Sequence, residues 1–386
     1  MSARRSTSTN THLHNALVLS GGGARAAYQV GVLKAIADIM PPTTRNPFGI
    51  ISGTSAGAIN AVGLASQADN FRNAVYNMES VWKFFQPEQV YRTDPWGVFC
   101  NTGRWLMSLI VNASQKPVSL LNNQPLAQLM ARLIHFDHIQ EAIDEGHLRA
   151  ISVTASGYNS GHSVAFFQGS PDISAWKRHQ RIGMRTHLRL EHLMASAAIP
   201  TIFPAIQINR EYFGDGAMRQ LAPISPALHL GARKVLVVGV SGNRSAPQVQ
   251  RPMDGYPSLA QISGHLLNSV FLDSLEYDIE RLERINRLLR TIPASVREKA
   301  KLGLHPVDSL VISPSQCLDR IAAKYLHVLP RSIRFFLHGI GATRSSGSSV
   351  LSYLLFDKLF CRELIELGYH DAIDKASQIE NFVSSD

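Results

Sequence analysis

Two short apolar runs open the chain, and each is followed by glycines and then by a helical pattern. Residues 16–20 lead into three glycines, and residues 48–52 lead into the stretch 53–57. Between the two runs, apolar residues recur at spacings of three and four over residues 24–40, where two prolines end the helix. A strand, a tight glycine turn and a helix, repeated twice, predict the start of an α/β sheet.

The rest of the chain continues this alternation and then becomes mostly helical. In the C-terminal third, apolar residues from Phe271 to Leu289 form a single stripe along a predicted helix. Further strands are predicted over residues 149–156, 163–168, 207–213, 234–240 and 309–312.

No linker-like break follows residue 14, and this absence favours a single domain over residues 14–386. Within it we expect a catalytic core over about residues 15–240 and a helical region over about residues 256–380. The polar stretch 1–13 is interpreted as a disordered tail.

The composition is that of an ordinary globular protein. Of 386 residues, 45% are apolar and 17% are charged. No stretch approaches the ~20 apolar residues that span a bilayer. The apolar run at residues 16–19 is shorter than a signal-peptide core. Cys100, Cys317 and Cys361 form neither a disulfide framework nor a metal-ligand spacing. We therefore expect a cytoplasmic protein without a signal peptide, a transmembrane helix or a bound metal.

The formal charge of +9 bears on partners rather than on the fold. Lysines and arginines are scattered and do not form a dense stripe with aromatics between them, which argues against nucleic acid. An anionic membrane surface would attract the same charge, so we expect a peripheral membrane contact. The aromatic-rich segment 81–112 and the basic, aromatic segment 331–338 are candidates for it, with ordinary packing as the alternative for both.

Residues 53–57 read Gly-Thr-Ser-Ala-Gly, a G-x-S-x-G sequence at a predicted strand-to-helix turn. A hydroxyl is a poor nucleophile unless it is held unhindered beside a base. A strained elbow presents Ser55 in this way, and Gly53 and Gly57 leave room where the backbone turns back on itself. Three such fixed positions arise by chance in about one chain in ten of this length, so the motif alone is only suggestive.

Residues 21–25 read Gly-Gly-Gly-Ala-Arg and join a predicted strand to a predicted helix. Such a loop offers unobstructed backbone N–H groups that suit a phosphate or an oxyanion. Gly21, Gly23 and Ala26 also satisfy the G-x-G-x-x-G/A fingerprint of a dinucleotide site. That site needs an acidic residue at the end of the second strand, where this chain has neither Asp nor Glu. An oxyanion is therefore favoured, and a nucleotide-binding protein stays open as an alternative.

Asp215 lies between Gly214 and Gly216, after an apolar stretch. An aspartate between two glycines usually belongs to a turn, but Ser55 requires a base. A Ser–His–Asp triad esterase, the nearest alternative, would need a histidine after the acid. The histidines that follow Asp215, none of them in a recognisable glycine or turn context, are His229, His265, His305, His327, His338 and His370. An α/β-hydrolase also passes through several strands before its elbow, whereas Ser55 follows only the second predicted strand.

Taken together, these stretches resemble the three signatures of the patatin-like phospholipase family. Gly-Gly-Gly-Ala-Arg opens the first helix, Gly-Thr-Ser-Ala-Gly-Ala follows at residues 53–58, and Asp-Gly-Ala stands at residues 215–217. Residues 195–200 resemble the family segment just ahead of the aspartate. The resemblance covers residues 15–220 well and the remainder loosely.

The resemblance implies a three-layer α/β/α domain with a mostly parallel central sheet and a helical C-terminal part. It implies a serine acyl hydrolase without metal or organic cofactor, in which Ser55 attacks an ester and Asp215 takes its proton directly. Phospholipids or lysophospholipids are the implied substrates, and an activating protein partner is left open. The implied oxyanion hole and its support consist of Gly21, Gly22, Gly23, Ala24 and Arg25.

Two positions depart from the family pattern without touching this dyad. Ala26 stands where many members carry another glycine, and Ala217 replaces a second glycine after the aspartate. A carboxylate with a pKa near 3.9 is a weak base toward a serine hydroxyl. Burial around the flanking glycines could raise the pKa of Asp215 and remove this difficulty.

Overall fold

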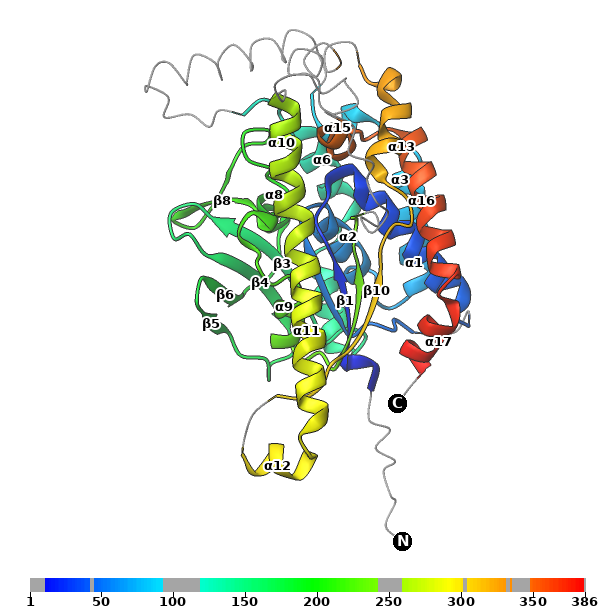
Figure 1. The fold of residues 1–386 in the computed structure, drawn as a ribbon. Coiled ribbons are helices and arrows are strands. Elements are labelled where there is room, and N and C mark those ends of the chain that lie inside the picture. The colour runs from blue at the N-terminus through cyan, green and yellow to red at the C-terminus, as the bar shows by residue number, and fades with distance from the viewer. Residues whose placement is uncertain are drawn as a thin grey trace.

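A computed structural model of the chain describes residues 11–41, 45–92, 119–241, 259–300, 304–330, 334 and 348–384 (Figure 1). Within these residues, the strands form one ten-stranded mixed sheet. The hairpin of β7 (Ile206–Ile208) and β8 (Glu211–Asp215) joins the sheet through β3. The other strands lie in the order β10 (Asp308–Ile312), β9 (Lys234–Val238), β1 (Asn15–Leu19), β2 (Ile50–Thr54), β3 (Ala150–Gly157), β4 (Ser163–Gly169), β6 (Arg181–Arg185) and β5 (Trp176–Arg178).

The strands from β10 to β3 are parallel to their neighbours, whereas β4 is antiparallel to β3. Strands β1, β2 and β3 are buried along their whole length, as expected of parallel strands covered on both faces. Because Leu19 pairs with Gly53 in register, the carboxyl ends of β1 and β2 meet at one edge of the sheet. The glycine loop that follows β1 and the turn that follows β2 therefore lie side by side.

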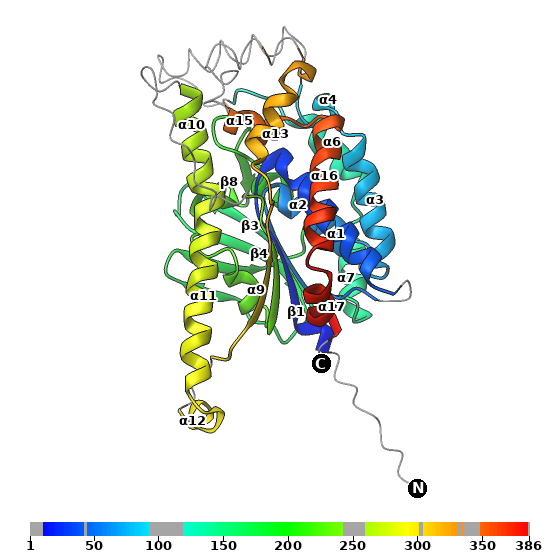
Figure 2. The same cartoon turned by 45° about the vertical axis from the view of Figure 1, so that its right-hand side comes forward.

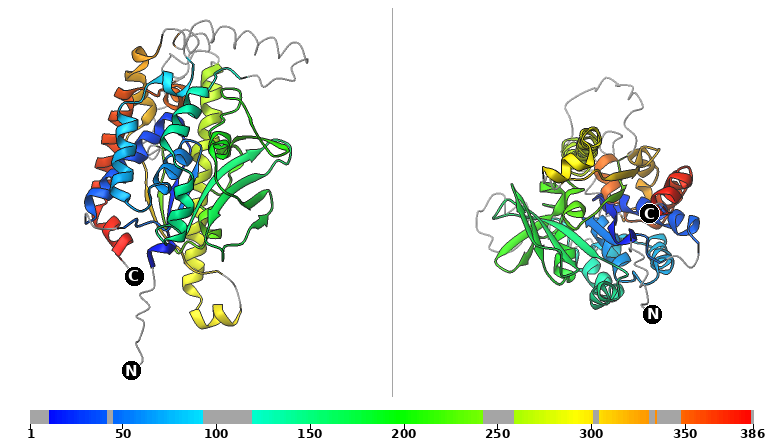
Figure 3. Two further views of the ribbon diagram at one scale, coloured as in Figure 1. Left: turned by 180° about the vertical axis from the view of Figure 1, so that it is seen from behind. Right: turned by 90° about the horizontal axis from the view of Figure 1, so that it is seen from below.

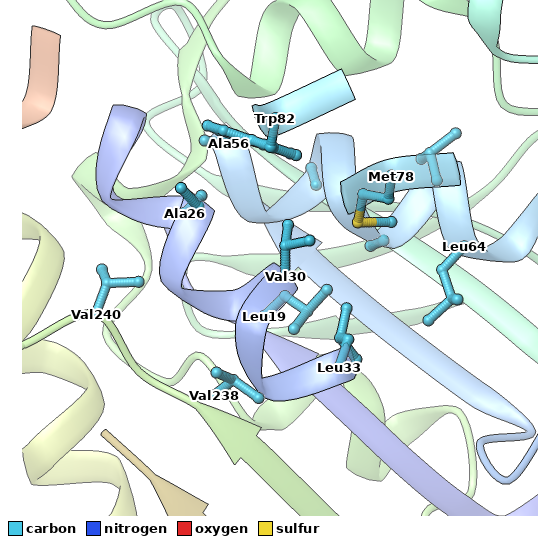
Figure 4. Close-up of a cluster of buried hydrophobic side chains, with 14 of the residues drawn as sticks. Leu19, Ala26, Val30, Leu33, Ala56, Leu64, Met78, Trp82, Val238 and Val240 are labelled. Atoms are coloured by element: carbon cyan, nitrogen blue, oxygen red, sulfur yellow. The ribbon is translucent and has the colours of Figure 1, made fainter. Parts of the chain in front are cut away.

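Helices cover both faces of the sheet (Figures 2 and 3). Side chains alternate along β1, so Leu17 and Leu19 pack into one core and Ala16 and Val18 into the other. The first core lies under α1 (Ala27–Ile39), α2 (Ala56–Ala65), α3 (Phe71–Lys83) and α16 (Lys358–Ile373). The second lies under α9 (Ser225–His229) and α11 (Ser274–Thr291). Figure 4 shows part of the first core, including Leu19, Val30, Leu33 and Trp82.

The remaining helices surround this sandwich and extend it at both ends. They are α4 (Pro87–Val90), α6 (Gln124–Leu133), α7 (Asp137–Asp144), α8 (Leu190–Ser196), α10 (Leu259–Asn268), α12 (Ala294–Lys299), α13 (Leu318–Lys324), α15 (Ser348–Leu354) and α17 (Ala376–Ser384). A short π-helix, Ser269–Asp273, joins α10 to α11. The expected three-layer α/β/α fold with a mostly parallel sheet is thus confirmed.

The C-terminal helix α16 packs backbone to backbone against α1. A Cβ atom added at Gly31 of α1 would lie 1.9 Å from the carbonyl oxygen of Ile365, and one added at Gly368 would lie 2.1 Å from that of Tyr28. The Tyr28 hydroxyl donates a hydrogen bond of 3.0 Å to Asp371 across the same interface. The last helices therefore share the hydrophobic core of the first.

Several local predictions need correction. The helix expected over residues 24–40 begins as a 3-10 turn, Gly23–Ala26, before α1. The single strand expected over residues 207–213 is the hairpin β7–β8, which turns at Asn209 with a φ of 56°. Strands β5 and β6 are missing from the sequence prediction, because β5 has only three residues, two of them charged, and the two apolar residues of β6 stand among arginines and a glycine.

The predicted tail is wrong for its last three residues. Thr11–His14 form a 3-10 turn, and the Gly49 N–H donates a hydrogen bond of 3.0 Å to the carbonyl of His12. Residues 1–10 lie outside the described residues, as do residues 93–112 of the aromatic segment and most of segment 331–338. In the described ranges, no helix combines the length and the apolar character that crossing a membrane requires.

Candidate active site

Ser55 occupies the turn between β2 and α2 in a strained backbone conformation. Its φ of 56° and ψ of −130° are unfavourable for a residue with a side chain. The turn depends on its flanking glycines. A Cβ atom at Gly53 would lie 2.6 Å from the Gly57 carbonyl oxygen, and one at Gly57 would lie 2.4 Å from the Leu19 carbonyl oxygen. The backbone therefore turns back on itself as tightly as the G-x-S-x-G sequence predicts.

The structure brings Asp215 directly against Ser55. The Ser55 Oγ donates a hydrogen bond of 2.5 Å to the Asp215 Oδ2. Asp215 ends β8, which pairs with β3 so that Ala155 lies opposite Asp215. Its second oxygen, Oδ1, accepts a hydrogen bond of 3.0 Å from the Ala217 N–H. The carboxylate is thus held in one orientation, with one oxygen on the hydroxyl and the other on the backbone.

The environment of Asp215 makes it a stronger base than a free carboxylate. Its side chain is completely buried, and burial raises the pKa of Asp215 to about 7, although the hydrogen bonds from Ser55 and Ala217 act to lower it. A group with this pKa can hold or release a proton near neutral pH. A carboxylate of ordinary pKa is a weak base toward a serine hydroxyl. Desolvation of Asp215 raises this pKa and so removes the difficulty.

Ser196 fixes the elbow from behind, a contact that sequence reasoning missed. Its Oγ accepts a hydrogen bond of 2.9 Å from the Ser55 N–H and donates one of 2.6 Å to the Thr154 carbonyl. Ser196 ends α8 and is completely buried. The only sequence signal was its place in the family-like stretch 195–200. We interpret Ser196 as a residue that positions Ser55.

We expect Ser196→Ala to lower kcat on a soluble ester by about tenfold and to leave KM within about twofold, because the Ser55 N–H loses its acceptor and the elbow relaxes. Ser152→Ala is the matched control, since Ser152 is equally buried but donates to Ser52 away from the elbow. Both variants should unfold at a lower temperature. Equal kcat in the two variants would show that Ser196 is merely structural.

The glycine loop passes directly beside the elbow. A Cβ atom at Gly21 would lie 3.1 Å from the Ser55 Cβ, and one at Gly22 would lie 2.4 Å from Val240. Gly23 has a φ of 56°. Because Gly23 and Ala24 begin a helical turn, their N–H groups have no carbonyl one turn earlier to accept them. Such groups next to a nucleophile are suited to a developing oxyanion.

Arg25 ties this loop to the C-terminal helices. It is buried, and its Nη2 donates a hydrogen bond of 2.6 Å to Asp319 of α13. Its Nε donates to Ser352 of α15 over 2.9 Å, and its guanidinium lies 4.0 Å from the ring centre of Tyr353. The family resemblance implies that Arg25 supports the loop, and the side chains that it binds lie about 300 residues further along the chain.

Beside Ser55 lies a small apolar cavity of about 40 Å³. Its walls come from the elbow, from helices α2, α3, α4 and α6, and from the segments around Ile199 and Phe356. Apart from Ser55, the lining is almost entirely hydrophobic, and it includes Ile59, Val81, Trp82, Phe85, Val90, Leu126, Met130 and Phe203. An apolar cavity of this kind suits a hydrocarbon group.

Three of the histidines that a triad could use contact other groups. The Nδ1 of His229 lies 2.8 Å from the Ser225 carbonyl, and its ring stacks on Trp176. His305 and His327 contact the carbonyls of Ala232 and Lys324. In the part of the chain that the structure describes, no histidine forms a hydrogen bond with Ser55 or Asp215. His338 lies outside that part.

A serine at a strained strand-to-helix turn, a buried carboxylate and a glycine loop on an α/β sheet have the arrangement of a serine hydrolase. A sequence model of the patatin-like phospholipase family matches residues 17–228. This span is more than half of the chain and contains Ser55, Asp215 and the glycine loop. The chain therefore belongs to the patatin-like phospholipase family.

Individual proteins also resemble the chain. A cGAMP-activated phospholipase of Pseudomonas aeruginosa (strain BWHPSA011 / Pa011) is 25% identical over 221 residues, which are 57% of this chain and 57% of that protein. The chain thus spans little more than half the length of this relative. The crystal structure of VipD from Legionella pneumophila aligns with 95% of this chain and 67% of that chain, at 12% identity and a TM-score of 0.34.

Proposed function

We propose that this protein is a lipid acyl hydrolase in which Ser55 and Asp215 form the catalytic dyad. The observation that carries the proposal is the 2.5 Å hydrogen bond between Ser55 and a buried Asp215 whose pKa is near 7. The apolar cavity next to Ser55 and the membership of the phospholipase family favour an acyl ester as the substrate.

In the proposed reaction, the Ser55 Oγ attacks the ester carbonyl while its proton passes to the Asp215 Oδ2. The oxyanion that forms accepts hydrogen bonds from the N–H groups of the loop around Gly22, Gly23 and Ala24. When the tetrahedral intermediate collapses, the proton on Asp215 goes to the leaving alcohol and Ser55 remains acylated. The oxygen of a water molecule then attacks the acyl carbonyl while one of its protons passes to Asp215. When this second tetrahedral intermediate collapses, the bond to the Ser55 Oγ breaks, the Oγ takes the proton back from Asp215, and the fatty acid leaves with both residues restored.

Phospholipids or lysophospholipids, reached at a membrane surface, are the substrates that we propose. Two apolar side chains shortly after Asp215 are open to solvent: Met218 is 44% exposed and Leu221 is 75% exposed. With the net charge of +9, they would favour a peripheral contact with an anionic bilayer from the cytoplasm. No cofactor is required by the proposed steps.

A regulator is compatible with this proposal. Ser55 is only 2% exposed, and the Phe271 side chain lies next to Gly21 at the same place. Access of a lipid therefore requires a local opening. Because the Pseudomonas relative is described as cGAMP-activated, a cyclic dinucleotide is a reasonable first candidate to test, beside a protein activator.

Fluorophosphonate labelling of the purified protein, with the site mapped by mass spectrometry, tests the proposal. We expect label on Ser55 in the wild type and no label at position 55 in Ser55→Ala. In Asp215→Asn, label on Ser55 should be strongly reduced. Ser152→Ala, which removes another completely buried serine that bonds to Ser52, should label like the wild type. Label at another serine, or none on the folded protein even with anionic vesicles and cGAMP, would reject the dyad.

A further inference from the structure

The cavity beside Ser55 is far smaller than a long acyl chain. A volume of about 40 Å³ leaves room for about three water-sized groups. A hydrocarbon chain of membrane-lipid length cannot fit there unless the cavity continues. A long acyl chain therefore needs additional space next to this cavity.

A much larger groove lies on the outer side of the same walls. It has a volume of about 710 Å³ and is bounded by α2, α3 and α6. This size is typical of sites that hold a small molecule. Four residues line both spaces: Ile59, Val81, Trp82 and Met130. The cavity and the groove are thus separated by one layer of side chains.

The groove has the chemistry of a site for the end of a hydrocarbon chain. Met78, Leu133 and Ile134 add apolar surface to the four shared residues. The other lining residues are mostly polar: they include the amides of Asn70 and Asn73 and also Asp69, Arg132, His135 and His138. Such a surface can hold a chain while its opening stays in water.

Among the four side chains that separate the cavity from the groove, Trp82 is held in place and Met130 is free to change its rotamer. The Trp82 Nε1 donates a hydrogen bond of 2.9 Å to the Asn60 Oδ1, and its ring stacks on Phe356. Met130, by contrast, is an unbranched thioether whose rotatable bonds allow it to move aside without breaking a polar contact. Met130 is therefore the side chain whose movement would join the cavity to the groove.

We propose that the groove between α2, α3 and α6 is the distal acyl-chain subsite and that Met130 is the gate through which the chain enters it. The proposal rests on the proposed function, and it deepens that function by assigning a preference for long acyl chains. The ester carbonyl lies at Ser55, the first methylenes fill the small cavity, and the remainder of the chain passes Met130 into the groove.

Gly63 offers a way to fill the groove without touching the active site. It lies in α2, lines the groove but not the cavity, and a Cβ atom there would meet only the Met78 Cε, at 3.6 Å. Gly63→Leu therefore places a side chain in the groove with little strain on the backbone. Gly63→Ala is the matched control, because it removes the helical glycine but fills almost none of the space.

The test is the dependence of kcat/KM on chain length, measured with 4-nitrophenyl butyrate and hexadecanoate. For Gly63→Leu we expect kcat/KM on the hexadecanoate to fall at least about tenfold, since each buried methylene contributes roughly fourfold. Its butyrate value and both values of Gly63→Ala should stay within about twofold of the wild type. Equal changes on the two esters, or none on either, would overturn the proposal.

A second pair of variants tests the gate. Met130→Ala should raise the ratio of hexadecanoate to butyrate hydrolysis, because the dividing layer is opened. Leu129→Ala, an equal truncation one residue earlier on α6, at a residue that lines neither space, should leave the ratio unchanged. An unchanged ratio in Met130→Ala would overturn the role of Met130.

A binding measurement keeps this proposal separate from the proposed catalysis. Ser55→Ala, which cannot form an acyl enzyme, is mixed with hexadecanoic acid that carries a diazirine at its chain end, and the photolabelled residues are mapped by mass spectrometry. We expect label on Met78, Leu133 or Ile134, and its loss when Gly63→Leu is added. Label elsewhere rejects the subsite even if the enzyme hydrolyses esters, whereas groove label without any hydrolysis by the wild type supports the subsite and rejects the proposed function.

Discussion

Replacing Asp215 by asparagine is expected to lower kcat for a soluble short-chain ester by about 10³- to 10⁴-fold. An asparagine keeps the size of the side chain, and its carbonyl oxygen can still accept the Ala217 N–H that now binds the Asp215 Oδ1. It cannot accept the proton of the Ser55 hydroxyl. The loss should therefore appear in kcat, in the rate of fluorophosphonate labelling, and much less in KM.

The pH profile of the wild type gives the same prediction a second readout. Asp215 acts as a base only when it is ionised, and burial raises its pKa to about 7. We expect kcat/KM to rise about tenfold per pH unit below that value and to level off above it. The residual activity of Asp215→Asn should lack this inflection. A histidine variant that abolishes hydrolysis while Asp215→Asn retains it would instead establish a triad.

The same pKa predicts that Asp215→Asn is more stable than the wild type. An acid whose pKa is raised on folding binds its proton more tightly in the folded state, so its contribution to stability is full below the unfolded pKa of 3.8 and is lost as the pH rises to about 7. The melting temperature of the variant should exceed that of the wild type above pH 7, with a difference that shrinks toward pH 4. An inactive variant that melts lower would show that the activity was lost through misfolding.

Much of the fold could be predicted because its central strands are buried on both faces. Continuous apolar runs mark β1, β2 and β9, and their positions agree with the pattern within a few residues. Strand β5, at the edge of the sheet, and its neighbour β6 have no such apolar run. Exposed positions of the edge strand hold Lys177 and Arg178, which an edge tolerates and a central strand does not. In β6 the exposed end holds Arg185.

The site residues that could be predicted from the sequence are those that stand within a recognisable local motif. Ser55 and the loop after β1 stand among glycines that the backbone geometry demands. The packing that covers them could not be foreseen, because Phe271, Asp319 and Tyr353 approach the loop from more than 200 residues away. Side chains that act through tertiary contact leave no local pattern to read.

The span that matches the family ends at residue 228, yet these later residues complete the surroundings of the glycine loop. Tyr353 is the clearest case. A Cβ atom at Gly23 would lie only 2.2 Å from the Tyr353 carbonyl oxygen. The loop is therefore held between the elbow on one side and the backbone of α15 on the other, and its shape depends on both.

Gly23→Ala is consequently expected to reduce kcat by about 10²- to 10³-fold, the loss typical of a displaced oxyanion donor. Two effects act together: the φ of 56° at Gly23 disfavours any side chain, and the Tyr353 backbone blocks the new methyl group. Either the loop or α15 must move, and the N–H groups beside Ser55 then no longer point toward the position of the oxyanion. The measurement is kcat on a soluble ester at saturating substrate, together with the melting temperature.

Gly146→Ala separates the two effects. Gly146 has a φ of 76°, but a Cβ atom there would meet nothing within 4 Å. The control variant should lose about 1–2 kcal/mol of stability through backbone strain alone and keep its kcat. If Gly23→Ala kept its kcat as well, the loop would not contribute to catalysis; if both variants lost kcat equally, general destabilisation would explain the result. A loss confined to Gly23→Ala would assign the oxyanion contacts to this loop, since strain of the same kind elsewhere leaves the reaction unchanged.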